Sequence, residues 1–554
     1  MAKKKRANNS VVTLRAGESI GAPAAEQDHA NLRDCFVELP IIDLLKKVDD
    51  PHCILLGRTG AGKSAIVWHL EQTAQKPSRI DPTEASFEYV ANSTIIRYFA
   101  ELGVELHVFY QYLWKHIIVV HVIRECLGVK TEESFKLLLK KLTALVVRDQ
   151  KKAVVISYLE RWNRGFWIDA EEVSREITTN LAKKLSAELG IAVEKLNARL
   201  AEETSTSESE RKNIQMRAQR IVNDLQMREL NETISALSDL LAARAVGYHI
   251  LIDDLDAEWG GNAQTQYDLL RALIECIKTF RRISNLKIVV AMREDLYEGM
   301  IRSVQDARFQ PEKFDGLLCR IRWKDVQLYR VIEARLNRLF HQRYTGQGVT
   351  WEHVLPADIK GTSTRGYIVE RTLKRPRDVI AFINKILEGA EGATLPLSSK
   401  AVLSSEANYS RDRLSNLARE WQACHPFITT YLNALAGSKE RTTVRALGED
   451  ELGSIALEVD ALERKPGDEV EQAASRVFKR NKEQAWPPLA QAVTACLFKV
   501  GAIGVKLRAD LPYKFCYEEH STIQTAEILP DTKIVVHPMV APALGVRPAR
   551  AEAA

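Results

Sequence analysis

A glycine-rich stretch near the N-terminus contains residues of the types and at the spacing needed to hold phosphate groups. In HCILLGRTGAGKSAIVWHL (52–70), the pattern GxxxxGK[ST] is met. Its glycines let backbone N–H groups curl around phosphate oxygens, and a following helix adds the partial positive charge of its N-terminus. We expect Lys63 to reach the β- and γ-phosphates and Ser64 to ligate Mg²⁺. The residues predicted to bind the nucleotide are Gly57, Arg58, Thr59, Gly60, Ala61, Gly62, Lys63 and Ser64.

Three aspartates follow an apolar run in the stretch ILIDDLDAEW (250–259). Unpaired carboxylates are costly at the end of a buried strand, so either a cation lies there or a hydrated loop begins. The phosphate loop favours the cation, because ligands of open α/β sheets bind outside the carboxyl ends of the strands. We predict that Asp253 holds Mg²⁺ through its waters and that Asp254 orients or deprotonates the attacking water. For Asp256, a contact with an arginine or a water and a plain loop start remain open.

A second apolar run, NLKIVVAMREDLYE (285–298), ends at Arg293. An arginine at this strand end can point at the γ-phosphate and report whether it is present. The alternative is that Arg293 only pairs with Asp295 or with the aspartate cluster. We predict the sensor role, because the position repeats the strand-end geometry of the site.

A further pair of arginines flanks a proline in LKRPRDVIAFINKIL (373–387). Proline is favourable in the first turn of a helix, and here it would fix the orientation of the arginines on either side. The planar, always-charged guanidinium suits a phosphate. We predict that Arg377 rather than Arg375 acts on the nucleotide, although one of the two could instead pair with Asp378.

The elements that must position these residues are buried strands followed by helices. The runs before Gly57, Asp253 and Arg293 are apolar without alternation, which is typical of parallel strands covered on both faces. The segment SFEYVANSTIIRYF (86–99) is a candidate for one more strand. We therefore predict an α/β core built on a parallel sheet.

Taken together, these segments resemble a family of bacterial P-loop ATPases related to the AAA+, STAND and KAP branches. The resemblance spans about residues 36–545 and also depends on RIRWKDVQLYRVIEARL, LFKVGAIGVKL and KIVVHPMVAPALG. It implies an α/β P-loop NTPase core of the additional-strand (ASCE) type and a helical lid with a sensor arginine. Members of such families often lie in phage-defence loci as ATP-driven sensors or switches. Asp254 replaces the glutamate usual in AAA+ proteins, as in KAP-like proteins, and its shorter reach implies slow turnover.

The rest of the chain is predicted to be organised around this core. A charged helical pattern in residues 171–203 indicates an inserted helical hairpin, and a helix followed by short strands over 487–538 suggests a winged helix. The predicted parts are a flexible basic tail (1–35), the first part of the core (36–99), a helical insertion (100–245), the second part of the core (246–322), a helical lid (323–396) and a C-terminal helical and winged-helix-like module (397–554).

Composition narrows the functional classes. The chain has 554 residues, of which 27% are charged, and a net charge of +5, which permits a nucleic-acid partner without favouring one. No apolar run reaches the length of a bilayer span, and the eight cysteines are scattered without a CxxC pair. Reduced thiols and the absence of an apolar segment after the basic start predict a cytoplasmic protein without a membrane partner.

The sequence therefore predicts a Mg²⁺-dependent ATPase that acts as a molecular switch. ATP and Mg²⁺ are the expected ligands, and a homo-oligomer or a partner effector protein is the expected assembly. Two alternatives stay open, namely ATP-dependent DNA binding by the winged-helix-like module and a nucleotide-binding scaffold with little turnover. An arginine acting across a subunit boundary could be any of Arg302, Arg308, Arg320 and Arg322.

Overall fold

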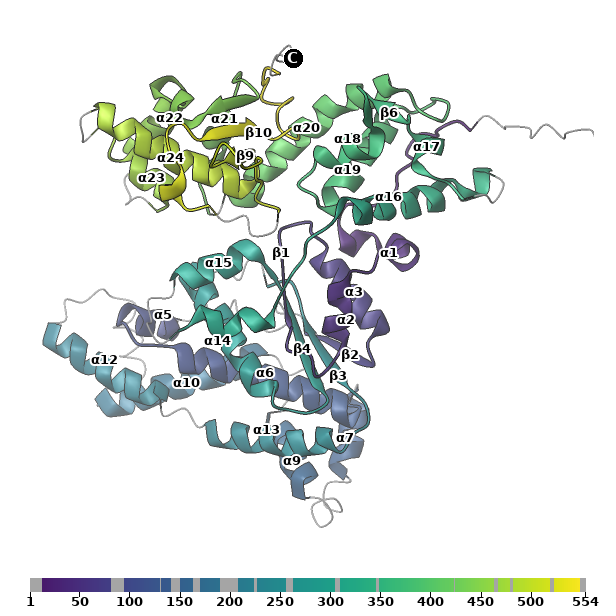
Figure 1. Cartoon of the computed structure of the whole chain (residues 1–554). Helices are drawn as coiled ribbons and strands as arrows, with labels where there is room; N and C mark the ends of the chain where they lie inside the picture. The colour runs from purple at the N-terminus through teal and green to yellow at the C-terminus, as the bar shows by residue number, and fades with distance from the viewer. Residues whose placement is uncertain are drawn as a thin grey trace, which may run out of the picture. The chain divides into compact units, whose positions relative to one another are not determined.

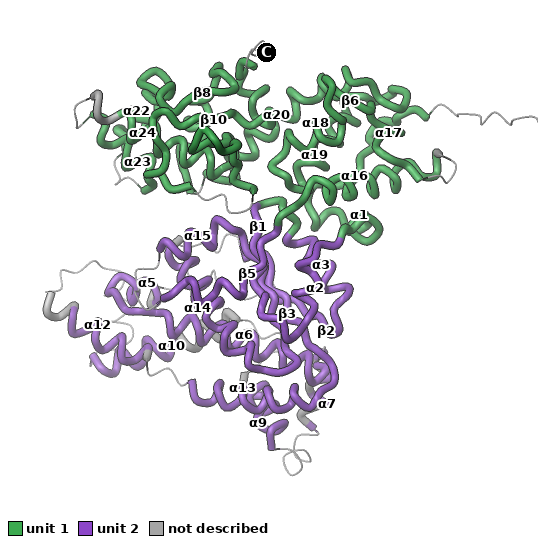
Figure 2. The backbone as a smooth tube through the Cα atoms, in the orientation of Figure 1, with its two compact units in different colours: residues 1–37, 59–62, 322–554 green, residues 38–58, 63–321 purple. Residues whose placement is uncertain are grey.

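The computed structural model describes residues 12–80, 94–129, 131–140, 150–162, 170–189, 208–223, 227–255, 263–303, 309–344, 348–422, 424–462, 467–478, 482–518 and 523–548. The chain forms two compact units (Figure 2). The sheet unit consists of residues 38–58 and 63–321, and the C-terminal unit consists of residues 1–37, 59–62 and 322–554. Residues 59–62, the centre of the predicted phosphate loop, thus belong to the C-terminal unit. The residues on either side of them belong to the sheet unit.

A five-stranded parallel sheet forms the centre of the sheet unit (Figure 1). Its strands are β1 (Ile54–Gly57), β2 (Lys76–Ile80), β3 (Tyr248–Ile252), β4 (Leu286–Arg293) and β5 (Leu318–Arg320). Their spatial order is β2-β3-β4-β1-β5, and every neighbouring pair is parallel. The predicted parallel α/β core is confirmed, and β4 is the additional strand that separates β1 from β3.

Burial explains why these segments form strands. Every residue of β1 and β3 is buried, as is every residue of β4 except Arg293, so both faces of the central strands are covered. The register places Gly57 beside Arg293 and pairs Ile252 with both Ile80 and Val290. The carboxyl ends of β1, β2, β3 and β4 therefore come together at one edge of the sheet.

The prediction of a strand within residues 86–99 is wrong for the part that the structure describes. Residues 81–93 lie outside the described residues, and Thr94–Glu101 forms the helix α5. Ile96 and Phe99, three residues apart, are both buried, which is the spacing of one helical face. The strand beside β3 at one edge of the sheet is instead β2. Its sequence KPSRI has no apolar run that would indicate a strand.

One continuous apolar core joins the sheet to the helices α5, α6, α9, α10, α12, α13, α14 and α15. Trp114 of α6 donates its indole N–H to the carbonyl oxygen of Leu269 in α14, at 2.9 Å, which joins α6 to α14 within this core. Of the hairpin predicted at residues 171–203, residues 171–189 lie in a helix, and residues 190–203 lie outside the described residues. Among the described residues, no helix is both long and apolar enough to cross a bilayer. The helices are α2 (Pro40–Lys46), α3 (Lys63–Thr73), α5, α6 (His107–Leu127), α7 (Glu132–Lys140), α9 (Gln150–Trp162), α10 (Ala170–Leu189), α12 (Glu208–Asn223), α13 (Met227–Ala242), α14 (Ala263–Phe280), α15 (Glu294–Ser303) and the 3₁₀ helix η2 (Pro311–Leu317).

The C-terminal unit also has a single apolar core, which runs through residues of both the predicted lid and the predicted C-terminal module. Its three-stranded antiparallel sheet has the order β8-β10-β9. Its elements are α1 (His29–Cys35), α16 (Asp325–Phe340), α17 (Trp351–Val354), β6 (Asp358–Ile359), β7 (Thr362–Ser363), α18 (Thr364–Glu370), α19 (Pro376–Gly389), α20 (Ser399–Trp421), α21 (Ile428–Asn433), β8 (Arg441–Thr443), α22 (Glu449–Asp460), α23 (Glu469–Ala474), α24 (Lys482–Val500), β9 (Ile503–Lys506) and β10 (Lys533–Val536), with the 3₁₀ turns η1 (Ala25–Gln27), η3 (His341–Tyr344), η4 (Val444–Ala446) and η5 (Thr525–Glu527).

The prediction that residues 1–35 form a flexible tail is wrong for residues 12–35. Leu14 and Ile20 are buried in the apolar core of the C-terminal unit. Asp28 forms a buried ion pair with Arg335 of α16, with 2.6 Å between the charged groups. The prediction rested on the basic run at the start of the chain, and the isolated apolar residues after it form no periodic pattern that would indicate burial. Residues 1–11, which include that run, lie outside the described residues.

Candidate nucleotide site

The predicted phosphate loop connects the end of β1 to the start of α3 at Lys63. Gly60 and Gly62 have φ angles of +76° and +97°, in the left-handed region that glycine adopts without strain. The Thr59 hydroxyl is buried and has no hydrogen-bond partner among the residues that the structure describes. The side chains of Arg58 and Lys63 are also buried. The segment therefore has the strand–loop–helix form that the motif needs to present backbone N–H groups to a phosphate.

Asp253 directly follows β3 and is 2% exposed. Its Oδ2 atom is buried and accepts no hydrogen bond within the described part of the chain. Burial, and then repulsion from Asp254, raise the pKa of Asp253 to about 6. Arg79 of β2 forms a long ion pair with Asp253, with 3.7 Å between its Nη2 and this oxygen. Such an unsatisfied buried carboxylate is stabilised when a cation arrives.

The donor types at this strand end fit Mg²⁺. Mg²⁺ prefers oxygen ligands and usually keeps several waters besides one or two carboxylates and the phosphates of the substrate. Asp253 supplies a carboxylate and Ser64, at the second position of α3, supplies a hydroxyl. Within the described ranges, no group of three His, Cys, Asp or Glu side chains could hold a metal ion by itself. Mg²⁺ at this site would therefore depend on nucleotide phosphates for its remaining ligands.

Asp254 adopts a φ of +58°, an uncommon conformation for a residue other than glycine. Strained backbone of this kind often occurs at functional sites. Its Oδ2 accepts a hydrogen bond of 2.6 Å from Arg79 Nη2, so this ion pair engages the predicted catalytic carboxylate. Sequence analysis missed Arg79. Arg79 is only a basic residue one position before the end of β2, and the sequence had favoured a strand at residues 86–99 instead. Asp256 lies outside the described residues.

Arg293 ends β4, where its backbone pairs with Gly57 at the start of the loop. Its guanidinium donates two hydrogen bonds to Asp295, of 3.0 and 2.7 Å. The alternative that the sequence left open, a pair with Asp295, is therefore present. The pair holds the guanidinium at the strand end, and the sensor role of Arg293 stays a prediction.

Two of the arginines considered for action across a subunit boundary pair with nearby acids. Arg302 lies 3.3 Å from Glu298, and Arg320 lies 3.4 Å from Glu294. Arg308 lies outside the described residues. These pairs do not distinguish among the candidates, so the identity of such an arginine stays open.

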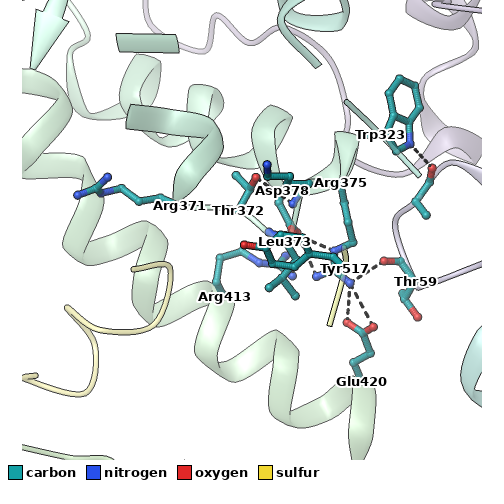
Figure 3. Close-up of polar contacts among 12 residues, drawn as sticks. Thr59, Trp323, Arg371, Thr372, Leu373, Arg375, Asp378, Arg413, Glu420 and Tyr517 are labelled. Atoms are coloured by element: carbon teal, nitrogen blue, oxygen red, sulfur yellow. Dashed lines mark hydrogen bonds and ion pairs between the residues drawn. The ribbon is translucent and has the colours of Figure 1, made fainter. Parts of the chain in front are cut away.

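In the C-terminal unit, two side chains hold backbone carbonyls of the loop (Figure 3). Arg375 Nη1 donates to the carbonyl oxygen of Thr59 at 2.7 Å, and Trp323 Nε1 donates to that of Ala61 at 2.8 Å. Arg375 precedes Pro376, the first residue of α19, and Trp323 lies just before α16. The loop is thus tied to the segments that begin two helices of this unit.

Arg375 belongs to a buried charge cluster with Asp378, Arg413 and Glu420, which we call the arginine cluster (Figure 3). Arg375 lies 2.9 Å from Asp378 and 3.1 Å from Glu420, and Arg413 lies 3.0 Å from Asp378. Burial opposes ionisation of Asp378, but Arg375 and then Arg413 outweigh it and lower its pKa to about 2. Of the two arginines that flank Pro376, the partner of Asp378 is Arg375.

Arg377 is placed differently from Arg375. Its guanidinium has no hydrogen bond or ion pair with any residue that the structure describes. Burial, and then the charge of Arg375, lower its pKa. A Cβ added to Gly60 would lie 2.8 Å from both Cβ and Cδ of Arg377, so this side chain packs closely against the loop. A half-buried cation that forms no ion pair with a described residue, beside a phosphate loop, is suited to an anionic ligand.

Comparison with known proteins gives a match to part of the chain and distant similarity over most of it. Residues 326–418, from α16 into α20, match the model of a family described as the FunZ-associated C-terminal helical domain. Over 530 residues the chain is 19% identical to the putative transposon gamma-delta 80.3 kDa protein of Escherichia coli (strain K12). This alignment covers 94% of the chain and 66% of the length of that relative.

Two solved structures are similar at low scores. A Walker-type ATPase of Pyrococcus abyssi has 12% identity and a TM-score of 0.35, covering 95% of this chain and 98% of that chain. The ORC1 protein of Aeropyrum pernix in complex with DNA has 12% identity and a TM-score of 0.29, covering 93% and 91%. Both TM-scores are below 0.5, so neither similarity assigns a function to this chain.

Proposed function

We propose that this protein binds and hydrolyses ATP with Mg²⁺ at the phosphate loop. The observation that carries the proposal is Asp253, a buried carboxylate at the strand end beside β4, one oxygen of which accepts no hydrogen bond from the described residues. A bound cation would offset the cost of burying this carboxylate. A loop of the GxxxxGK[ST] type binds the phosphates of a nucleotide together with their Mg²⁺. Mg²⁺ bridges phosphate oxygens and neutralises the charge that develops in phosphoryl transfer.

Each residue then has a defined task. Backbone N–H groups of the loop and Lys63 bind the phosphates, while Ser64 and Asp253 hold Mg²⁺. Asp254 orients the attacking water and accepts its proton once its hydrogen bond with Arg79 is given up. That requirement, together with the short aspartate side chain, supports slow or partner-stimulated turnover.

The switch part of the proposal concerns Arg377. ATP offers it a γ-phosphate that ADP lacks, so Arg377 would bind the two nucleotides with different affinity. A ligand shifts a conformational equilibrium only through such a difference. Because α19 begins at Pro376, directly before Arg377, this difference acts on the helical lid (323–396) and the module that follows it.

The biological role is proposed from the family resemblance alone. It assigns the chain to a regulatory or sensor ATPase of a bacterial defence system, acting as a homo-oligomer or through an effector protein. The division of the chain beyond residue 35 and a cytoplasmic location remain part of this proposal, whereas residues 12–35 belong to the C-terminal unit.

Calorimetry and phosphate release test the central claim. Lys63→Ala should weaken ATP binding by at least about a hundredfold, because the loop loses its phosphate-directed cation and charge-assisted contacts. Lys76→Ala, which removes an exposed lysine from β2, is the matched control and should bind ATP normally. Normal ATP affinity in Lys63→Ala would contradict the assignment of the loop. ATP binding by the wild type without phosphate release would instead identify a scaffold without turnover.

A second candidate function, DNA binding, is favoured by the arrangement of α21 to β10. The antiparallel sheet β8-β10-β9 with the helices α22, α23 and α24 between β8 and β9 resembles a winged helix. Affinity for a DNA duplex should fall steeply with salt if phosphate contacts dominate. Absence of duplex binding at low salt would remove this candidate.

A further inference from the structure

A cavity of about 840 Å³ lies within the helical part of the sheet unit. Its lining comes from α6, α12, α14, η2 and the segment that precedes α6. None of the described residues that line it belongs to the phosphate loop or to the strands of the sheet. The volume lies in the range of pockets that hold small molecules, about 300–1,000 Å³.

Three lysines that form no ion pair with a described residue line this cavity: Lys115 of α6, Lys278 of α14 and Lys313 of η2. Lys115 and Lys278 are half-buried, while Lys313 is exposed. Three positive charges around one hollow concentrate a positive potential there.

The main carboxylate of the lining is already neutralised by other groups. Glu275 lies 2.6 Å from His107 and 3.1 Å from Arg271, and it accepts a hydrogen bond of 2.8 Å from Gln111. Burial works against ionisation of Glu275, but its contacts with His107 and Arg271 lower its pKa. The second carboxylate, Glu105, is exposed. Glu275 also attracts Lys278, but the described lining keeps an excess of positive charge, because two carboxylates face three lysines and Arg271.

Aromatic rings fix part of this basic surface. The rings of Phe309 and Phe314 are stacked, with 5.3 Å between their centroids. Lys278 Nζ lies 3.6 Å from the centroid of Phe314, and Arg271 Cζ lies 5.0 Å from that of Phe309. Such cation–π contacts orient a basic group without neutralising it. Lys278 is thus held in place while its charge stays available to a ligand.

We propose that this cavity binds a small phosphorylated molecule of about nucleotide size, at a second site distinct from the phosphate loop. Lysine ammonium groups bind phosphate as compact point charges, and three of them match a ligand with several negative charges. Phe309 and Phe314, which line the cavity, offer apolar surface to the organic part of the ligand. The proposal does not depend on the ATPase assignment.

Calorimetry on the full chain tests the second site with ADP and inorganic tripolyphosphate as probes. The Lys63→Ala background reduces binding at the loop, and it should retain one binding event per chain for at least one of the probes. Adding Lys115→Gln or Lys313→Ala should weaken that event by roughly tenfold to a hundredfold, since each removes one charge-assisted contact. Two separate lysines are used because a fold defect is not expected at the exposed Lys313.

Lys151→Ala is the matched control, since Lys151 is an exposed lysine of α9 paired with Asp239 and does not line the cavity. It should bind the probes as the Lys63→Ala background does. Absence of any binding event in that background would overturn the proposal, as would equal affinities for the cavity variants and the control. In the wild-type background, Lys313→Ala should leave ATP hydrolysis at the loop intact, so failure of the ATPase assignment can be recognised separately.

Discussion

Replacing Arg375 and Arg377 in turn by alanine should separate stability from nucleotide response. The two residues flank Pro376 but have opposite surroundings. Arg375 is 2% exposed and fully engaged in the arginine cluster and with the Thr59 carbonyl. The guanidinium of Arg377 has no such partner within the described residues. We expect Arg375→Ala to destabilise the C-terminal unit and Arg377→Ala to leave its stability nearly unchanged.

The structure sets the size of the Arg375 effect. Removing one member of a buried ion pair costs about 3–5 kcal/mol, because the remaining charge is left buried and uncompensated. Asp378 would keep Arg413 and the backbone N–H of Leu373, at 3.0 and 3.1 Å. The loss falls mainly on Glu420, whose side chain is 9% exposed. We therefore expect the lower part of the range, about 3 kcal/mol.

Arg377→Ala removes a cation for which burial is unfavourable, so its cost should stay below about 1 kcal/mol. Lys385→Ala provides a surface control on the same helix. Lys385 of α19 pairs with Glu388 at 3.0 Å and with Asp412 of α20 at 3.3 Å, and its side chain is 33% exposed. Pairs near the surface contribute about 0–1 kcal/mol each.

Hydrogen exchange measured by mass spectrometry is the appropriate assay, because a chain with two units need not unfold in one step. Peptides of α19 and α20 in Arg375→Ala should exchange roughly a hundredfold faster, as about 3 kcal/mol corresponds to that factor. Arg377→Ala should exchange like the wild type yet lose the change in shape, measured by small-angle scattering, between ATP analogue and ADP. If both variants exchange alike, or if Arg377→Ala keeps the full nucleotide response, the distinction between the two arginines is refuted.

Single substitutions at the loop and strand ends test the site itself. Gly60→Ala should abolish ATP binding in calorimetry, because alanine is strained at φ +76° and its Cβ would meet side-chain atoms at 2.8 Å. Gly62→Ala, with its nearest contact at 3.8 Å, should lose less. Asp254→Asn should bind ATP and Mg²⁺ but release phosphate about a hundredfold more slowly, since an amide cannot accept the proton of water; a normal rate would exclude its role as base. Arg293→Ala should weaken ATP about tenfold and ADP little, since charge-assisted contacts are of that strength, whereas equal weakening would identify a structural arginine. The pKa of Asp253, raised to about 6 in the folded state, makes the folded chain bind more protons than the unfolded chain between pH 4 and 6. The contribution of Asp253 to stability is therefore greatest below pH 4 and is lost as the pH rises through 6. Asp253→Asn should thus flatten the pH dependence of the free energy of chemical unfolding. The same variant should bind Mg²⁺ more weakly above pH 6.

The sequence predicts the central strands and the loop because their chemistry leaves few alternatives. A strand buried on both faces must be apolar throughout, as β1, β3 and β4 are. The positive φ angles of Gly60 and Gly62 require glycine or a residue that tolerates strain. These constraints act within a few residues, so a single sequence reveals them.

Other features depend on distant partners and were not predictable. Arg79 reaches Asp254 because β2 lies beside β3, and nothing in the sequence KPSRI predicts that the two strands pair. The burial of Leu14 depends on residues more than 300 positions later, such as Ala393, to which its backbone bonds at 2.9 Å. Lys115, Lys278 and Lys313 form one basic surface only after α6, α14 and η2 pack together. Local pattern carries no information about such pairings.

The choice between Arg375 and Arg377 shows why burial and partners decide function where residue type cannot. Arg375 has an extended backbone before Pro376, and its guanidinium is committed to the arginine cluster and the Thr59 carbonyl. Any movement of Arg375 toward a ligand would leave buried acids uncompensated, so it can only position the loop. Arg377 has no such commitment and packs against Gly60. A nucleotide that attracts Arg377 therefore acts on α19 at its first turn, while the same helix start holds the loop through Arg375. If the γ-phosphate binds Arg377, as we propose, ATP and ADP bind with different affinity to the two positions of α19, and a nucleotide switch requires such a difference.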